Sequence, residues 1–187
     1  MADLDHAEFA RLIGLGLPAS TALLVLEGVR DEDFEVAHVE NGRRAREWCA
    51  DLAAFPQGLE PSWDLAPEHF YLALDGEHPG LPGARTWVLI LADVPEVLGT
   101  LNYVSSRDND PWDEGHRLKS CGTAYRWSVD LPVTPPLLAI DKTRIHIVGG
   151  MHRFHLAVAC GATEMPFLVE PAALAAILAL LRSARMI

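Results

Sequence analysis

The chain has few positive charges, few cysteines and no long apolar run. Its 15 lysine and arginine residues stand against 26 aspartate and glutamate residues, and the formal net charge is −11 at pH 7. A protein this acidic is poorly suited to neutralising the phosphates of duplex DNA. The cysteines lack the paired spacing of a zinc site. The longest apolar stretch, residues 172–181, is too short to span a bilayer.

The start of the chain lacks the features of a secretory leader. Residues 1–9 read MADLDHAEF, with no basic segment and no apolar core. Half of the 187 residues are apolar, which is enough for the core of one domain with an added subdomain. We therefore expect a cytoplasmic protein that has no membrane partner and does not bind duplex DNA.

The first 85 residues are predicted to form a mostly helical N-terminal extension. Residues 55–85 are rich in proline and glycine, which is typical of a loop-rich boundary. Apolar periodicity and capping residues predict four elements before that boundary. They are a helix over 3–16 capped by Asp3 or Asp5, a helix over 22–28 capped by Ser20 or Thr21, a strand over 34–39, and a helix over 42–54 capped by Asn41.

Residues 86–187 are predicted to form an α+β domain, with a small mixed β-sheet and helices. The continuous apolar run over 86–94 predicts a buried central strand. The other expected elements are a helix over 95–101, a hairpin of strands over 137–140 and 144–148, a helix after Gly150, a strand over 167–169 and a helix over 172–182. The last helix is apolar nearly all round, so it is either buried or the contact of a homodimer.

The turn formed by Gly149, Gly150, Met151, His152 and Arg153 has the features of an anion site. Two glycines let the backbone turn sharply and bring bare N–H groups close to a ligand. The helix that begins there directs its unpaired N–H groups and positive dipole end at the same spot. An arginine is unfavourable in the first turn of a helix unless an anion offsets its charge. The alternative is an ordinary strand-to-helix turn whose glycines serve geometry alone.

The polar stretch over residues 103–126 supplies further candidates. Its arginine, Arg107, can pair with an anion at the turn, and its carboxylates can act as a general base or bind Mg²⁺. The candidate carboxylates are Asp108, Asp110, Asp113 and Glu114. Glu114 is the first choice, because the neighbouring His116 and Arg117 could tune it. The alternative is that Asp113 or Glu114 caps a helix running toward Trp127.

The order of these elements resembles the signature of the ParB/sulfiredoxin superfamily. The similarity runs from Pro135 to Glu170 and comprises two short strands, the Gly-Gly-Met-His-Arg turn, a helix ending at Gly161, and a strand after Met165-Pro166. Sulfiredoxins have Gly-Gly-Cys-His-Arg here, free serine kinases Asp-Gly-His-His-Arg, and ParB proteins Gly-Glu-Arg-Arg. Met151 stands where sulfiredoxins have their catalytic cysteine. Because a thioether cannot be a thiolate nucleophile, sulfinic acid reduction is excluded.

The resemblance implies a nucleotide-dependent phosphotransferase that acts on a small molecule with ATP or ADP and Mg²⁺. The glycine turn, His152, Arg153 and Arg107 would hold the phosphates, and a carboxylate of the polar stretch would act as the base or bind Mg²⁺. The catalytic residues would be Glu114, Asp110 and His152. A nucleotide-binding switch of ParB type without turnover is the second hypothesis. A ParB-like nuclease is the third, although the chain is acidic and has no evident metal cluster.

Overall fold

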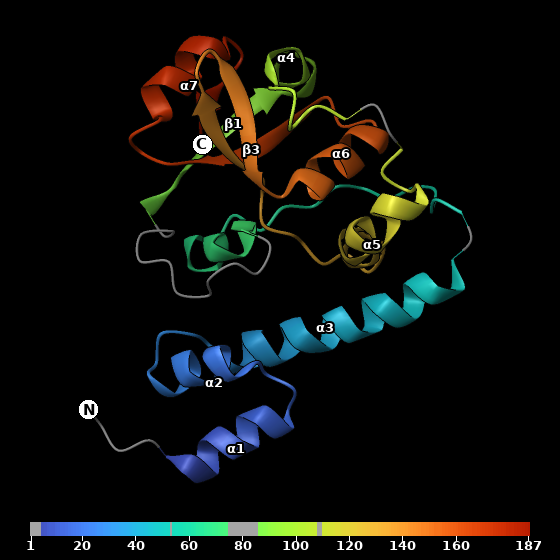
Figure 1. Ribbon diagram of the computed structural model, residues 1–187, viewed down its shortest axis with the longest axis vertical. Coiled ribbons are helices and arrows are strands. Elements are labelled where there is room, and N and C mark those ends of the chain that lie inside the picture. The colour runs from blue at the N-terminus through green and yellow to red at the C-terminus, as the bar shows by residue number, and fades with distance from the viewer. Residues whose placement is uncertain (1–4, 53, 75–85, 108–109) are drawn as a thin grey trace. The chain divides into compact units, whose positions relative to one another are not determined.

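The computed structural model describes residues 5–52, 54–74, 86–107 and 110–187 (Figure 1). Contacts within the chain divide it into two compact units, residues 1–51 and 52–187. The boundary that the sequence predicts near residue 85, between a helical extension and an α+β domain, therefore lies inside the second unit. No helix in the described ranges is long and apolar enough to cross a membrane.

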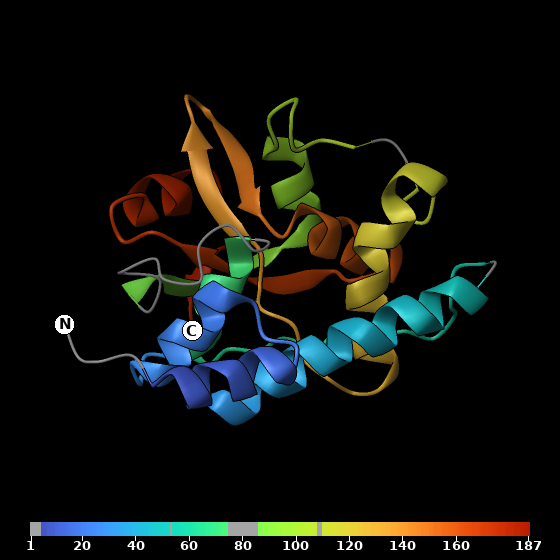
Figure 2. The same ribbon diagram turned by 60° about the horizontal axis from the view of Figure 1, so that its bottom comes forward.

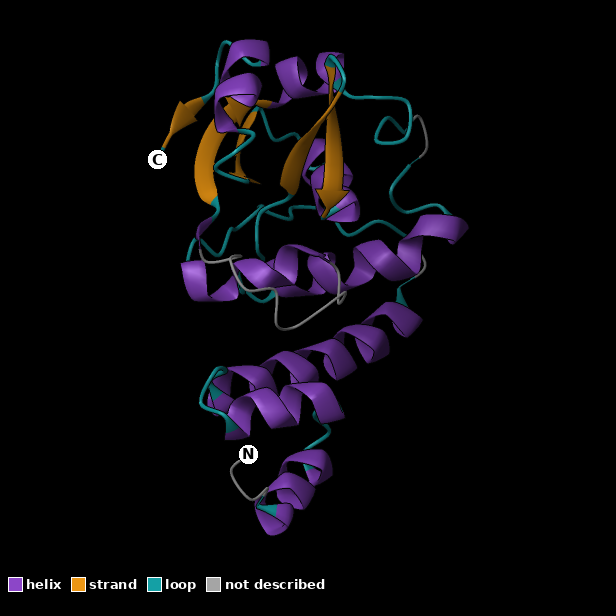
Figure 3. Cartoon of the chain, turned by 60° about the vertical axis from the view of Figure 1, so that its left-hand side comes forward, coloured by secondary structure: helices purple, strands orange, loops and turns teal. Residues whose placement is uncertain are grey.

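The first unit consists of helices, drawn in purple in Figure 3. Their bounds are α1 (His6–Gly14), α2 (Ala19–Leu26) and α3 (Glu32–Asp51). As predicted, Asp5 caps α1, and its carboxylate accepts the N–H groups of Ala7 and Glu8. Pro18 occupies the cap position of α2 and no side chain caps that helix, so the predicted caps lie inside it. Leu12, Leu17 and Ala22 form the small buried core of this unit.

The strand predicted over residues 34–39 is wrong, because these residues belong to α3. The carboxylate of Asp31 accepts the N–H of Phe34 and thereby satisfies a free donor at the start of the helix. Glu40 pairs with Arg43 and Arg44, at the spacing that places side chains together on a helix. The described part of this unit contains no strand with which residues 34–39 could pair, and a lone strand would leave its backbone groups unbonded.

The second unit is built on a five-stranded mixed sheet with the order β3-β2-β4-β1-β5. Its strands are β1 (Val88–Asp93), β2 (Leu137–Asp141), β3 (Arg144–Gly149), β4 (Glu164–Val169) and β5 (Arg185–Met186). Strand β2 runs parallel to β4, and the other neighbouring pairs are antiparallel. The predicted α+β class with a mixed sheet is confirmed. Figure 2 shows the β2–β3 hairpin as the orange pair of strands.

Helices of the second unit agree in part with the sequence patterns. Their bounds are the 3₁₀ helix η1 (Pro67–Leu74) and the α-helices α4 (Val94–Thr100), α5 (Glu114–Ser128), α6 (Met151–Ala159) and α7 (Leu174–Leu180). The end of the polar stretch is thus the helix α5, which packs against α6. In α7 only Ile177 is buried, and the homodimer contact through this helix stays a prediction.

The turn between α4 and Arg107 is bonded to β3. The Asn102 N–H donates to the carbonyl of Ile145 at 2.7 Å, and the Ile147 N–H donates to Ser105 Oγ at 2.9 Å. Ser105 is fully buried. These bonds fix the turn on the sheet, and the chain leaves it directly at Arg107.

Candidate functional site

The two glycines before α6 are required by the packing of this region. A Cβ on Gly149 would lie 2.0 Å from the carbonyl oxygen of Ala73, so only glycine lets η1 approach the end of β3. Gly150 is the N-cap of α6 and has φ +79°, a left-handed conformation that glycine adopts readily. Both positions are therefore explained by geometry, whether or not a ligand binds at the turn.

Arg153 lies in the first turn of α6, and its guanidinium is held by backbone oxygens. Nη1 donates to the carbonyls of Leu72 and Thr134 at 3.2 and 3.0 Å, and Nη2 donates to that of Ala73 at 2.8 Å. The side chain is buried. Arg153 thus joins α6 to the end of η1 and to the segment before β2. To bind a phosphate, as the sequence predicts, it would have to leave these carbonyls.

A different set of side chains, Arg107, His116 and His152, gathers beside the first turn of α6. We call these three residues the Arg107 cluster. Arg107 Nη1 lies 3.4 Å from Nδ1 of His116, and 3.2 and 3.4 Å from Nδ1 and Nε2 of His152. Because these distances to the two His152 nitrogens are similar, the guanidinium is not committed to one lone pair of the ring. The centroids of the two imidazole rings are 5.6 Å apart.

The charge of Arg107 is suited to an anionic ligand. The side chain is half-buried, and this burial lowers the pKa of Arg107 because the charged form loses hydration. No carboxylate in the described ranges lies within ion-pair distance of it. A bound anion would therefore supply the countercharge that the described part of the fold does not.

A pocket of about 540 Å³ lies next to the Arg107 cluster. Among the described residues, its polar lining consists of Arg107, Asp110, Gln57 and His155, and its apolar lining consists of Phe55, Pro111, Val158 and Ala159. The ring of Phe55 packs edge-on against Trp112. The α6 residues in this lining lie beyond its first turn, so the pocket runs along the helix. Arg107 is the residue that the pocket and the cluster share.

His155 is a site residue that the sequence interpretation missed. Its ring is buried, and Nε2 donates to the carbonyl of Ser105 at 2.9 Å. Burial lowers the pKa of His155, and the positive charge of Arg107 and His116 lowers it further. The sequence feature that could have identified His155 is its spacing from His152, because residues three apart lie on the same side of a helix.

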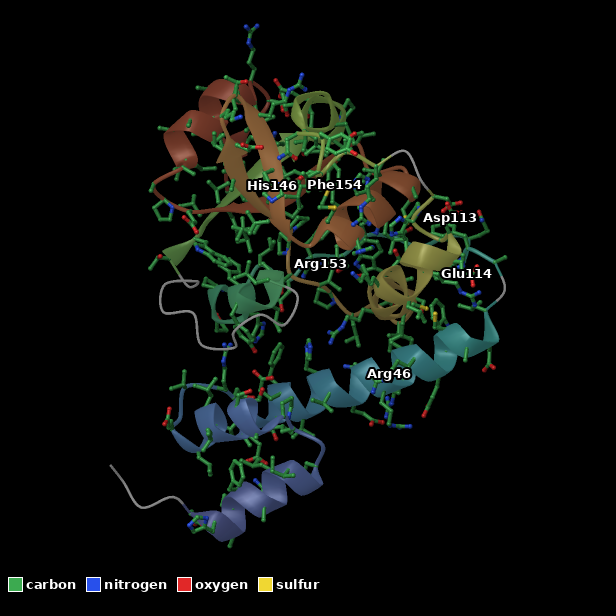
Figure 4. The ribbon with its side chains drawn as sticks, in the orientation of Figure 1. Arg46, Asp113, Glu114, His146, Arg153 and Phe154 are labelled. Atoms are coloured by element: carbon green, nitrogen blue, oxygen red, sulfur yellow. The ribbon has the colours of Figure 1, made fainter. Side chains whose placement is uncertain are left out.

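The predicted carboxylates lie in different places. Figure 4 shows Asp113 and Glu114 at the N-terminal end of α5, apart from Arg153. Both side chains are exposed, and neither lines the pocket. Asp110 does line it, while one carboxylate oxygen accepts the Trp112 N–H at 2.8 Å. Asp108 lies outside the described residues. The alternative in which Asp113 caps a helix is correct for its position, because Asp113 is the N-cap residue of α5. Its side chain, however, accepts no cap hydrogen bond.

Ser105 and His146 form a contact that resembles a catalytic pair but has a structural role. Ser105 Oγ lies 2.9 Å from His146 Nδ1, as a nucleophile and its base would. However, Ser105 is fully buried, and its Oγ already accepts the N–H of Ile147. No substrate can reach this oxygen, so we assign the pair to the fixation of the turn on β3.

The side chains at the pocket fit a magnesium ion only if it arrives with phosphates. Mg²⁺ is usually held by one or two carboxylates together with phosphate oxygens and water. Among the described residues, Asp110 is the carboxylate that lines the pocket. Within the described residues, no group of three or more histidine, cysteine, aspartate or glutamate side chains could hold a metal ion.

Comparison of the chain with protein-family models, curated proteins and solved structures finds no match. A functional assignment must therefore rest on the geometry and chemistry of the Arg107 cluster and its pocket.

Proposed function

We propose that the second unit binds a nucleotide, ATP or ADP, at the Arg107 cluster and transfers a phosphoryl group to a small molecule in the adjacent pocket. The observation that carries this proposal is the half-buried Arg107, which lies against two imidazoles and has no carboxylate partner among the described residues. Its position beside the N-terminus of α6 adds the positive end of the helix dipole.

We also propose that this unit is a variant of the ParB/sulfiredoxin fold. The supporting order is the hairpin β2–β3, a left-handed glycine at position 150, the helix α6, and a strand β4 parallel to β2. The arginine of the motif is used differently here. Arg153 bonds to backbone carbonyls, and Arg107 takes the place of a phosphate ligand in our proposal.

Positioning and charge stabilisation account for most of the chemistry that such a site would perform. Phosphoryl transfer demands few covalent steps from the protein, because the negative charge on the transferred group must mainly be held and neutralised. Arg107, His116 and His152 would donate to the phosphate oxygens. Asp110 would contribute to holding Mg²⁺, which when bound neutralises charge on the nucleotide.

Binding without turnover, as in a ParB-type switch, is the second candidate. It is favoured by the exposed positions of Asp113 and Glu114, which leave the described pocket with Asp110 as its only carboxylate. A nuclease is the weakest candidate, because the chain carries a net charge of −11.

The proposal is tested by titrating the full chain with ATP, ADP and CTP in the presence of Mg²⁺, using calorimetry, and by following phosphate release. Arg107→Ala should weaken the binding of the preferred nucleotide by about 10- to 100-fold, the loss expected for a hydrogen bond between charged groups. Arg182→Ala is the matched control, because it removes the same charge from an exposed residue between α7 and β5. Equal affinities in the two variants would contradict the proposal. Binding without phosphate release, with or without added metabolites, would favour the switch.

A further inference from the structure

The hydrogen bond of His155 determines which of its ring nitrogens can act on a ligand. The carbonyl of Ser105 can only accept, so Nε2 of His155 must carry the proton. In the neutral imidazole, Nδ1 then has the free lone pair. No described residue hydrogen-bonds to this nitrogen. The same arrangement, a base whose second nitrogen is oriented by an acceptor, is found in nucleophile–histidine pairs and in catalytic triads.

The surroundings of His155 keep its ring uncharged near neutral pH. Arg107 approaches from the segment before α5, and His116 approaches from α5 itself; both oppose a positive charge on the ring. His152 lies one turn earlier on the same helix, and Asp110 lines the same pocket with the opposite charge. A group that is neutral at the working pH, yet can be protonated, is what general base catalysis requires.

The position of His155 relates it to the transferred group. His155 and Arg107 line the same pocket, and Arg107 also forms the cluster in which we place the phosphates. A molecule in the pocket would therefore lie within reach of both the imidazole and the arginine of the proposed phosphate site. The volume of about 540 Å³ is in the range of pockets for small molecules.

We infer that the pocket along α6 receives the hydroxyl-bearing substrate and that Nδ1 of His155 accepts its proton during phosphoryl transfer. This inference rests on the proposed function, and it assigns the role of base to His155 in place of Glu114. The substrate oxygen forms a bond to the γ-phosphorus of ATP as its O–H bond breaks and the proton moves to Nδ1. The bond from that phosphorus to the bridging oxygen breaks, and ADP leaves with the electron pair. The imidazolium then returns the proton to water.

The first measurement tests the state of the ring without any ligand. Long-range ¹H–¹⁵N correlation spectra of the full chain should show His155 at neutral pH as the uncharged tautomer with hydrogen on Nε2. The resonance is assigned by its absence in His155→Gln. Observation of the other tautomer, or of a charged ring, overturns the inference.

The second measurement uses MgATP as the probe, with water as the acceptor. The glutamine side chain in His155→Gln keeps an N–H donor for Ser105 but cannot take up a proton. This variant should therefore bind MgATP within about twofold of the wild type, while phosphate release falls by about 10²- to 10⁴-fold. The decrease of the rate toward acidic pH should disappear as well. His69→Gln is the control, because His69 is a partly buried histidine that contacts Asp64 and does not line the pocket.

The outcomes separate this inference from the proposed function. Phosphate release that is unchanged in His155→Gln overturns the inference and leaves the nucleotide site intact. Binding of MgATP without any turnover overturns the inference and favours the switch. Absence of binding by the wild-type chain overturns both.

Discussion

Arg153 and Arg107 lie in the same unit and differ in what satisfies their charge. The guanidinium of Arg153 donates to three backbone carbonyls and is buried by the fold. That of Arg107 contacts imidazole rings and has no carboxylate partner in the described ranges. An arginine whose donors are used by the backbone holds elements together, whereas one that lies beside imidazole rings without a carboxylate partner keeps its charge for a ligand. The two arginines thus mark a structural side of the glycine turn and the side on which we propose that a ligand binds.

The largest effect is expected from Gly149→Ala, on the structural side. The new Cβ would lie 2.0 Å from the backbone oxygen of Ala73, and backbone atoms cannot move aside as a flexible side chain does. We expect the free energy of unfolding to fall by about 3 kcal/mol or more, as in severe overpacking. Gly122→Ala in α5 is the matched control, since nothing lies within 4 Å of its Cβ. Urea unfolding of both variants measures the difference. Equal stabilities would show that η1 does not pack against the turn as described.

Arg153→Ala should have the next largest effect. It removes the donors to the carbonyls of Leu72, Ala73 and Thr134, and a buried acceptor left without a donor costs about 1–3 kcal/mol. We expect a loss of about 3 kcal/mol in the free energy of unfolding, measured by urea denaturation. Arg107→Ala should change the free energy of unfolding by less than about 1 kcal/mol, because no carboxylate among the described residues pairs with its charge. A reversed order of the two variants would contradict the division into a structural and a ligand side.

The pH dependence of the free energy of unfolding should reveal the protonation of His155. Its pKa is lowered from 6.5 in the folded chain, so the unfolded state binds the proton first as the pH falls. Stability is therefore fully present above about pH 6.5 and is lost as the pH falls toward the lowered pKa, by at most about 1.4 kcal/mol per pH unit. His155→Gln should lose less stability than the wild type on acidification, measured by urea unfolding at several pH values. An identical loss in both proteins would indicate that the buried ring does not resist protonation.

The smallest effect is expected from Glu114→Gln. Glu114 is exposed at the start of α5 and does not line the pocket. Phosphate release from MgATP should therefore stay within about twofold of the wild type, far below the loss of about 10²-fold or more that removal of a base produces. Asp110→Asn serves as the comparison, because Asp110 lines the pocket. A large loss in Glu114→Gln would return the role of base to this residue.

The sequence predicted the elements around the turn because local signals agree there. Apolar alternation identifies β3, the glycines mark the turn, and Gly161 lies just beyond the end of α6 with φ +84°. The strand over residues 34–39 was predicted from a period-two pattern that is too short to exclude a helix. Whether such a segment forms a strand depends on a partner strand, which the local pattern does not contain.

The roles of the site residues depended on contacts between distant segments. An arginine in the first turn of a helix is visible in the sequence, but the carbonyls of Leu72 and Ala73 that bind Arg153 come from η1, about 80 residues earlier. His155 becomes notable only when Ser105 and Arg107 are placed beside it. The pocket likewise combines Phe55 with α6, and no spacing rule relates two segments so far apart in the chain.

The turn that precedes Arg107 also bears on association between copies of the chain. Strand β3 is an edge strand of the sheet, and an edge strand is a template on which another chain can add a strand. An incoming strand would need the carbonyl of Ile145 and the N–H of Ile147. That carbonyl already accepts the N–H of Asn102, and that N–H already donates to the hydroxyl of Ser105. Because Ser105 also orients His155, a substitution that loosens this turn would uncover a site for intermolecular β-addition and misorient the imidazole together. Aggregation and loss of the proposed pocket chemistry should then appear in the same variants.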